Sequence, residues 1–251
     1  MGTRMMRAPW AVGVVIPARN EERSMLACLN AVLRALDRCR AALSDSWIVV
    51  VADSCTDATA TLARQILKGR GVVVECCAAS PGSARRLGAT EVLAHFADIP
   101  TSRLWMANTD ADTCVAEGWI ERQLELADTG CCAVAGIVKV DRIEGLDRST
   151  MHALLSNYVI HDDGTHPHVH GANLGVRADA YLDAGCWSHL TVAEDHCLWS
   201  RIRARHWPTS SCSQTVVHTS GRLHGRATGG FADTLREKLE LLQARSLACT
   251  R

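Results

Sequence analysis

The chain has 251 residues, with 27 Lys plus Arg and 27 Asp plus Glu, so its formal net charge at pH 7 is zero. Without a surplus of basic residues, it has no overall field that would attract nucleic acid or an anionic membrane surface. Hydrophobic residues make up 47% and charged residues 22% of the chain. These values are typical of a globular protein, and the length suits one large α/β domain or two small ones.

The apolar run at residues 8–17 is too short to span a bilayer, and it lacks the small-residue cleavage site of a secretory signal. None of the 12 cysteines forms a C-x-x-C pair, and most lie in apolar runs, where a free thiol packs as a small hydrophobic side chain. We therefore expect a cytoplasmic protein without a transmembrane segment. Peripheral contact with a membrane stays open.

The first half of the chain alternates between short apolar runs and segments with helical spacing. The runs expected to form buried strands are 11–16, 47–51, 71–75 and 103–107. The expected helices are one running from an N-cap at Asn20 to about residue 36, then 58–68, 81–96 and one that begins near Glu117. This alternation predicts an α/β fold with an open parallel sheet covered by helices on both faces.

The second half is less regular. It contains two further expected strands at 131–140 and 214–218, and three expected helices at 149–160, 178–184 and 194–205. The tail places Phe231, Leu235, Leu239 and Leu242 on one helical stripe. Because no linker or repeat interrupts the chain, we predict a single domain over residues 1–251. Its first half covers about 11–112, and its second half covers about 113–251.

Polar side chains follow the expected strands of the first half. They are Asn20, Glu21, Asp53, Arg85, Arg86, Asp110 and Asp112. In open α/β sheets ligands bind beyond the carboxyl ends of the strands, so acidic and basic groups would converge there. This combination suits a nucleotide diphosphate with a metal. A dinucleotide site is not indicated, because no G-x-G-x-x-G follows the first strand, and no P-loop is present.

Asp110 and Asp112 are spaced i, i+2, so in an extended segment they would share one face and repel each other. A divalent cation that carries a diphosphate would relieve this repulsion. The alternative is that the two aspartates are turn and cap residues before the next helix.

Two other polar patterns leave alternatives open. His166, His168 and His170 could line one face of an extended segment and bind Zn²⁺ or Cu²⁺, or they could form a polar lid beside the active site. Glu194 and Asp195 begin an expected helix, where acidic side chains also stabilise the helix dipole.

Five segments occur in an order and spacing that resembles the family 2 glycosyltransferases of the GT-A fold. They are Val14–Glu21, Ala52–Asp57, Thr109–Asp112, Gly171–Gly175 and Glu194–Asp195. The resemblance covers residues 11 to 220. It implies a Rossmann-like, mostly parallel sheet with a nucleotide-binding N-terminal half and an acceptor-binding C-terminal half. It also implies a UDP- or GDP-sugar donor, Mn²⁺ or Mg²⁺, and transfer of the sugar to an acceptor hydroxyl, with inversion of configuration.

The resemblance also implies roles for individual residues. The turn from Pro17 to Glu21 would wrap the nucleoside, and Asp53 would hold the base. The implied donor-binding residues are Pro17, Ala18, Arg19, Asn20, Glu21, Asp53, Arg85, Asp110, Ala111, Gly171, Ala172 and Asn173. Ala52 stands where the family commonly has a second Asp, so the choice of base stays open.

Asp112 would ligate the metal, Asp110 would approach the ribose or the metal, and His218 would complete the metal site. Asp195 corresponds to the catalytic carboxylate of inverting members, with Glu194 as the less direct candidate. The base would take the proton of the acceptor hydroxyl, and the metal would stabilise the departing diphosphate. Retention of configuration, a sugar-nucleotide nucleotidyltransferase and a non-catalytic nucleotide-sugar sensor remain alternatives.

Overall fold

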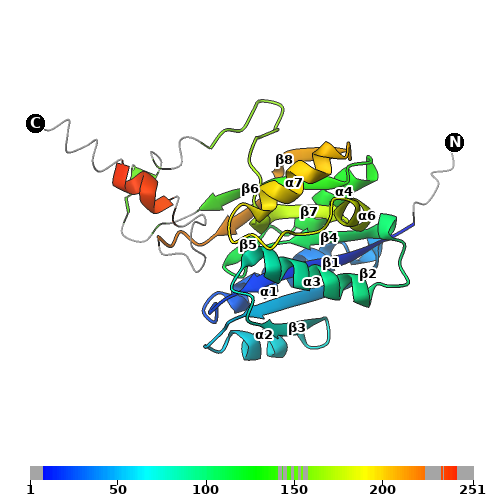
Figure 1. Cartoon of the computed structure of the whole chain (residues 1–251), viewed down its shortest axis with the longest axis horizontal. Helices are drawn as coiled ribbons and strands as arrows, with labels where there is room; N and C mark the ends of the chain where they lie inside the picture. The colour runs from blue at the N-terminus through cyan, green and yellow to red at the C-terminus, as the bar shows by residue number, and fades with distance from the viewer. Residues whose placement is uncertain are drawn as a thin grey trace, which may run out of the picture.

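The computed structural model describes residues 8–140 and 158–223, together with 143, 146, 147, 150, 151, 154, 233 and 235–241. These residues form a single α/β domain around one eight-stranded sheet, in the order β3-β2-β1-β4-β7-β6-β8-β5. Helices cover both faces of the sheet (Figure 1). The expected α/β fold with one helix-flanked sheet is confirmed.

The first half has the regular alternation that the sequence predicts. Its elements are β1 (Trp10–Ala18), α1 (Met25–Arg38), β2 (Leu43–Asp53), α2 (Thr59–Leu67), β3 (Gly71–Cys76), α3 (Pro81–His95) and β4 (Leu104–Asn108). β1 pairs in parallel with β2 and β4, and β2 pairs in parallel with β3. The strands read as continuous apolar runs because helices bury both of their faces.

The second half is a mixed sheet. Its elements are β5 (Thr113–Val115), α4 (Trp119–Asp128), β6 (Ala133–Val140), β7 (Leu174–Arg177), α6 (Ala178–Asp183), α7 (Glu194–Ala204) and β8 (Thr209–Thr219). β7 runs antiparallel to both β4 and β6, while β8 is parallel to β6 and antiparallel to β5. The parallel arrangement is therefore complete only in the first half.

Two of the expected helix boundaries are wrong, and a third lies within two residues of its expected position. Asn20 is not the N-cap of α1, because its φ is 55° and the helix begins at Met25 after Ser24. The helix expected near Glu117 begins at Trp119. The helix expected to end at residue 160 does not reach that point, since residues 158–160 have no regular structure. Most of its remaining residues, like Phe231 and Leu242 of the tail, lie outside the described residues.

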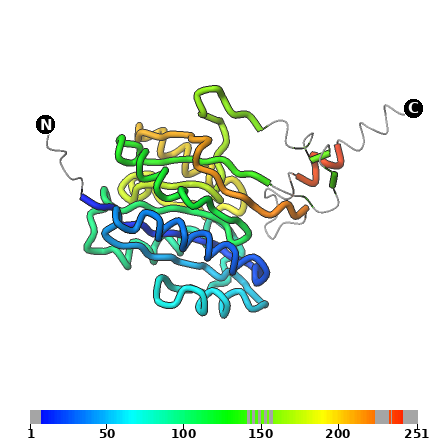
Figure 2. The backbone as a smooth tube through the Cα atoms, turned by 180° about the vertical axis from the view of Figure 1, so that it is seen from behind, coloured from blue at the N-terminus to red at the C-terminus, as the bar shows by residue number. Residues whose placement is uncertain are grey.

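Two hydrophobic cores lie on opposite faces of the sheet. One contains buried residues of α1, α2 and α4, and the other contains buried residues of α3, α6 and α7. Figure 1 shows α3, α6 and α7 in front of the strands, and Figure 2, from the opposite side, shows α1 in front. Leu235 and Leu239 of the tail pack with Val140 and Leu154 in a smaller cluster.

Candidate functional site

Four strand ends meet at one edge of the sheet, which we call the rim. β1, β2 and β4 are parallel, so their carboxyl ends all lie there. β7 runs antiparallel to β4 with Leu174 opposite Asn108, so the residues that precede β7 also reach the rim. The chain order thus brings the segments after β1, β2 and β4 together with residues 171–173. This is the edge where ligands bind in open α/β sheets.

The loop after β1 is fastened to the loop after β2. The backbone N–H of Glu21 donates to the Thr59 hydroxyl at 2.7 Å, and the Thr56 N–H donates to Asn20 Oδ1 at 2.7 Å. Cys55 donates to the carbonyl of Ala18 at 3.4 Å. These bonds fix the turn from Pro17 to Glu21 in a single shape beside the rim, with the Arg19 side chain exposed.

Asp53, at the end of β2, is buried and accepts hydrogen bonds from the next loop. Its carboxylate accepts from the backbone N–H groups of Ala79 at 2.9 Å and Ser80 at 3.2 Å, and from the Ser54 hydroxyl at 3.0 Å. Ser80 in turn caps α3 by accepting from the Ser83 N–H. Asp53 therefore holds the start of α3 against β2.

Arg85, from the first turns of α3, joins two carboxylates from distant parts of the chain. Its Nη2 lies 2.6 Å from Asp110 Oδ1, and its Nη1 lies 3.7 Å from Glu194 Oε1. Only 4% of the Arg85 side chain is exposed. Burial lowers the pKa of the guanidinium, because it disfavours the charged form. The nearby carboxylates, chiefly Asp110 and Glu194, outweigh this effect, and the pKa is raised. A Cβ at Gly171 would overlap this guanidinium, so a larger residue there would force the guanidinium or the chain to shift.

Asp110 and Asp112 lie on a turn between β4 and β5, not on an extended segment. The turn is closed by a hydrogen bond from the Thr113 N–H to the Asp110 carbonyl at 3.1 Å. The expectation that the two carboxylates share one face of a strand is therefore wrong. Each pairs with a different arginine, Asp110 with Arg85 and Asp112 with Arg222.

Arg222 lies just after β8 and bridges Asp112 and Glu21. Its Nη1 is 2.6 Å from Glu21 Oε1, and its Nη2 is 3.1 Å from Asp112 Oδ2. Burial raises the pKa of Asp112 to about 6; Arg222 lowers it, while Asp110 and Glu21 raise it further. Three carboxylates thus act on one another at the rim. Carboxylate oxygens are the ligands that Mg²⁺ and Mn²⁺ prefer, but Arg222 lies between Glu21 and Asp112.

His218 lies on β8, half-buried, opposite Cys114 of β5 and Lys139 of β6. The side chain that β8 turns toward Asp112 is Thr219, whose hydroxyl is 3.5 Å from Asp112 Oδ1. Within the part of the chain that the structure describes, no three His, Cys, Asp or Glu side chains are grouped so as to hold a metal. His218 therefore stays a predicted ligand.

Asp195 and Glu194 begin α7 but have different surroundings. Asp195 is half-buried, and its carboxylate accepts from the backbone N–H groups of Gly171 at 2.8 Å and His196 at 2.7 Å. Glu194 is 7% exposed and faces Arg85. Burial raises the pKa of Glu194, while Arg85 lowers it. Asp195 is the more accessible of the two carboxylates.

Asn173 does not present its side chain to a ligand. It is 0% exposed; its amide accepts from Trp119 Nε1 at 2.8 Å and donates to the carbonyls of Ile137 and Thr215 at 2.9 Å each. These bonds link α4, β6 and β8, so the Asn173 amide is a packing element. The predicted contact of the Asn173 side chain with the donor sugar is therefore wrong. Gly171, Ala172 and Ala111 are buried and have no polar side chain. They can offer a ligand only backbone groups, or room for it to approach the backbone closely.

The three alternating histidines do share a face, and they stack. The ring centroids of His166 and His168 are 5.9 Å apart, and those of His168 and His170 are 6.0 Å apart. Tyr158 stacks on His168 at 3.9 Å, and its hydroxyl lies 3.2 Å from His170 Nε2. Burial lowers the pKa of His170 to about 4, so its ring is neutral at pH 7. The stack adjoins the site through Gly171.

Two participants were not assigned a role from the sequence. Arg222 follows the expected strand 214–218 within Ser220-Gly221-Arg222, and a cation just past a strand end is the signal that could have found it. Tyr158 was placed inside an expected helix, where it would not have been linked to the histidines.

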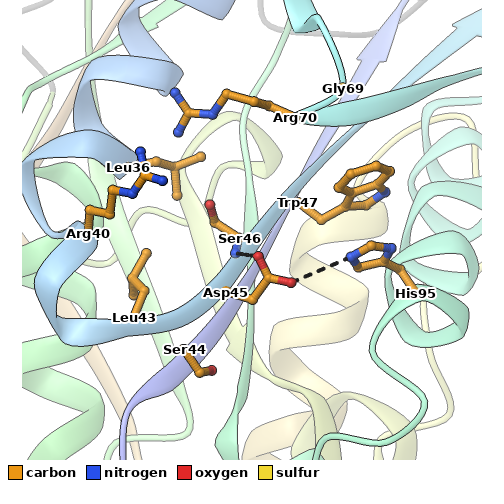
Figure 3. A pocket seen from close by; sticks show the side chains of 10 residues that line it. All are labelled: Leu36, Arg40, Leu43, Ser44, Asp45, Ser46, Trp47, Gly69, Arg70 and His95. Atoms are coloured by element: carbon orange, nitrogen blue, oxygen red, sulfur yellow. Dashed lines mark hydrogen bonds and ion pairs between the residues drawn. The ribbon is translucent and has the colours of Figure 1, made fainter.

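A separate cavity of about 350 Å³ lies around the start of β2, at the opposite edge of the sheet from the rim. Figure 3 shows Arg40 and Arg70 on one side of this strand, and Trp47 with His95 on the other. The Trp47 and His95 rings stack at 4.1 Å, and Arg70 pairs with Asp37 at 2.8 Å. This cavity is not part of the candidate site.

The comparisons with known proteins agree with this architecture. The description "Glycosyl transferase family 2" matches residues 13–183, which is more than half of the chain. The chain therefore belongs to glycosyl transferase family 2, and its architecture is that of the GT-A fold. None of the curated proteins matches it.

Many solved structures are similar to it, including the following three. TarS residues 1–349 of S. aureus with UDP-GlcNAc has a TM-score of 0.61 at 15% identity, covering 88% of this chain and 61% of TarS. The mannosyltransferase PcManGT of Pyrobaculum calidifontis with GDP-Man and Mn²⁺ has a TM-score of 0.57 at 18% identity, covering 85% and 57%. Glucosyl-3-phosphoglycerate synthase of Mycobacterium tuberculosis, with Mn²⁺, UDP and phosphoglyceric acid, has a TM-score of 0.55 at 16% identity, covering 96% and 80%.

The chain spans less than two thirds of the length of the TarS and PcManGT chains, so the likeness establishes the fold of the shared part. Over the described residues, no helix has both the length and the apolar character needed to cross a membrane.

Proposed function

We propose that this protein is a metal-dependent glycosyltransferase that moves a sugar from a UDP- or GDP-sugar to an acceptor hydroxyl. The observation that carries the proposal is the cluster of Glu21, Asp110 and Asp112 at the rim, with Arg85 and Asp195 beside it. Membership of glycosyl transferase family 2 supports the reaction class. The relatives of the same fold include one with UDP-GlcNAc and one with GDP-Man and Mn²⁺.

In this proposal residues 11–112 bind the donor and residues 113–251 bind the acceptor. The turn from Pro17 to Glu21 and the carboxylate of Asp53 surround the nucleoside. Asp112 holds Mn²⁺ or Mg²⁺, with Asp110 beside it and His218 as a further ligand. When bound, the cation offsets the negative charge that develops on the departing diphosphate.

Asp195 is the general base. The acceptor hydroxyl attacks the anomeric carbon, its proton passes to the Asp195 carboxylate, and the bond to the nucleoside diphosphate breaks. A single displacement of this kind inverts the configuration. The hydrogen bond from the Gly171 N–H holds the Asp195 carboxylate in place. The remaining lone pairs of the carboxylate are left for the acceptor hydroxyl. Glu194 positions Arg85 instead of reacting, since it is buried and faces that guanidinium.

Calorimetric titration with UDP, GDP and their common sugar conjugates, with and without Mn²⁺, tests donor binding. We expect one nucleotide class to bind in a Mn²⁺-dependent manner. A folded protein that binds none of these compounds would refute the proposal.

The Asp195→Asn variant tests the chemistry. It should bind the donor as the wild type does and lose transfer, because an amide cannot accept the proton. Release of nucleoside diphosphate, and not of pyrophosphate, distinguishes glycosyl transfer from nucleotidyl transfer. If Asp195→Asn turned over at the wild-type rate, the assignment of the base would be wrong.

A further inference from the structure

Arg222 occupies the space between the carboxylates that the proposed function assigns to the cation and the donor. It contacts one oxygen of each, Glu21 Oε1 at 2.6 Å and Asp112 Oδ2 at 3.1 Å. The side chains of Glu21 and Asp112 are 8% and 13% exposed. Arg222 therefore supplies positive charge to two desolvated carboxylates.

The other contacts of the Asp112 carboxylate are weak. Its Oδ1 lies 3.4 Å from the Thr113 hydroxyl and 3.5 Å from the Thr219 hydroxyl, at the long limit of hydrogen bonds. A divalent cation bound to Asp112 would lie beside the guanidinium, and two positive groups cannot share that carboxylate without repulsion. Cation binding at Asp112 therefore weakens the contact of Arg222 with Asp112 Oδ2 and favours its departure.

Arg222 is attached in a way that permits this movement. Its side chain is 30% exposed, and it belongs to a short segment after β8 without regular structure. One backbone hydrogen bond, from the Ser220 N–H to the Asp112 carbonyl at 3.2 Å, holds the segment at the rim, and within the segment the Arg222 N–H donates to the Ser220 hydroxyl at 3.3 Å. The backbone can stay in place while the long side chain turns.

We propose that Arg222 takes the place of the cation in the ligand-free protein and moves to the diphosphate of the donor when cation and donor bind. This inference rests on the proposed function. A guanidinium fits phosphate oxygens as well as carboxylate oxygens, so the donor gives Arg222 a new partner when the cation displaces it. The cation and the nucleotide then strengthen each other's binding, by the same factor in both directions.

The test measures Mn²⁺ affinity of the full chain by electron paramagnetic resonance, with and without saturating UDP or GDP. For the wild type we expect weak Mn²⁺ binding alone and about tenfold tighter binding with the nucleotide, within the usual range of coupling between two sites. Arg222→Met should bind Mn²⁺ alone about tenfold more tightly than the wild type, because the competing charge is gone. Its gain from the nucleotide should largely disappear.

Two variants serve as controls. Arg205→Met removes an exposed arginine that pairs with Asp183 at 2.9 Å, away from the rim, and should leave both Mn²⁺ affinities unchanged. Arg222→Lys keeps the charge, so its Mn²⁺ affinity without nucleotide should stay close to that of the wild type. If Arg222→Met fails to fold, the wild type alone still tests the inference through the effect of the nucleotide on its Mn²⁺ affinity.

Three results would overturn the inference. The first is equal Mn²⁺ affinity of Arg222→Met and wild type without nucleotide. The second is a wild-type Mn²⁺ affinity that does not change when the nucleotide is added, and the third is an Arg222→Met variant that gains as much Mn²⁺ affinity from the nucleotide as the wild type does. Each of them leaves donor binding standing. Absence of nucleotide binding by the folded wild type would refute the proposed function itself, so the two failures are distinguishable.

Discussion

Two arginines each join a pair of carboxylates at the rim, and they differ in burial and attachment. Arg85 is 4% exposed, comes from α3, and lies between Asp110 and Glu194 with its guanidinium 5.6 Å from the Trp187 ring. Arg222 is 30% exposed and comes from the irregular segment after β8. The first arginine is enclosed by the body of the protein, whereas the second reaches in from its edge.

This difference in burial and attachment gives the two arginines different roles. Arg85 connects the turn after β4 to the start of α7, which fixes the distance between the two halves of the site. Without it, the buried carboxylate of Glu194 and the partly exposed carboxylate of Asp110 would lose the positive charge that they share. Arg222 neutralises carboxylates that a ligand can also neutralise, so it is exchangeable. A buried arginine fixes the geometry of the site, and a half-exposed one adjusts its charge.

The largest effect should come from Arg85→Met. Removing one partner from a buried charge network leaves the others uncompensated, which costs about 3–5 kcal/mol. We expect urea denaturation to show a loss of that size in the free energy of unfolding. Arg205→Met, which breaks an exposed pair, should change it by less than about 1 kcal/mol. Equal losses in the two variants would show that Arg85 is no more structural than a surface residue.

The regular half of the fold was readable from the sequence, because each strand from β1 to β4 contains a continuous apolar run, and polar residues follow the runs of β1, β2 and β4. Parallel strands then place these polar residues at one edge. Expectation and structure differ at the loops. Asn20 looked like an N-cap, but it adopts φ 55° and its side chain binds Thr56 instead. Asn is common both at helix N-caps and in loops that hydrogen-bond to other loops, so the residue type alone does not tell these two roles apart.

The sequence predicted which residues belong to the site, but not which of them form ion pairs with one another. Asp110, Asp112, Arg85 and Glu194 were all named, yet the sequence does not tell which arginine meets which carboxylate, because those pairs are 25 to 110 residues apart. Asn173 shows the converse: its position at the rim follows from β7, but its burial under Trp119 depends on packing across three elements. Such contacts are properties of the assembled sheet.

The next effect in size should be a gain in stability from Asp112→Asn. The folded pKa of Asp112 is about 6, above the ordinary 3.8, since burial disfavours the ionised form. Asp112 therefore contributes to the free energy of unfolding in its protonated form. This contribution is fully present below about pH 4 and is lost as the pH rises through 6. A shift of about two units corresponds to about 2–3 kcal/mol.

At pH 8 in EDTA, Asp112→Asn should therefore unfold at higher urea than the wild type, and the two should coincide near pH 4. Equal stability at both pH values would contradict the burial of this carboxylate. A stabilised variant that binds no Mn²⁺ would identify Asp112 as a residue kept for ligand binding at the expense of stability.

A smaller loss should follow from Gly171→Ala. The added methyl would overlap the Arg85 guanidinium, which neighbouring groups hold on both sides, so relief requires a backbone shift. Overpacking of this kind costs about 1–3 kcal/mol. Gly118→Ala is the matched control, because the nearest atom to its Cβ would be Glu121 Oε2 at 4.0 Å. Thermal unfolding of both variants measures the difference, and a Gly171→Ala protein as stable as Gly118→Ala would mean that Arg85 moves freely.

The smallest effect should come from Arg222→Met, at about 1 kcal/mol or less, because its side chain is 30% exposed and already interacts with water. Asp112, with a pKa already near 6, takes up a proton when the guanidinium is removed, and this limits the cost at pH 7. Mn²⁺ should raise the unfolding temperature of Arg222→Met more than that of the wild type, since a ligand stabilises the folded state according to its affinity. A loss as large as that of Arg85→Met, not reversed by Mn²⁺, would remove the distinction between the two arginines and make both of them structural.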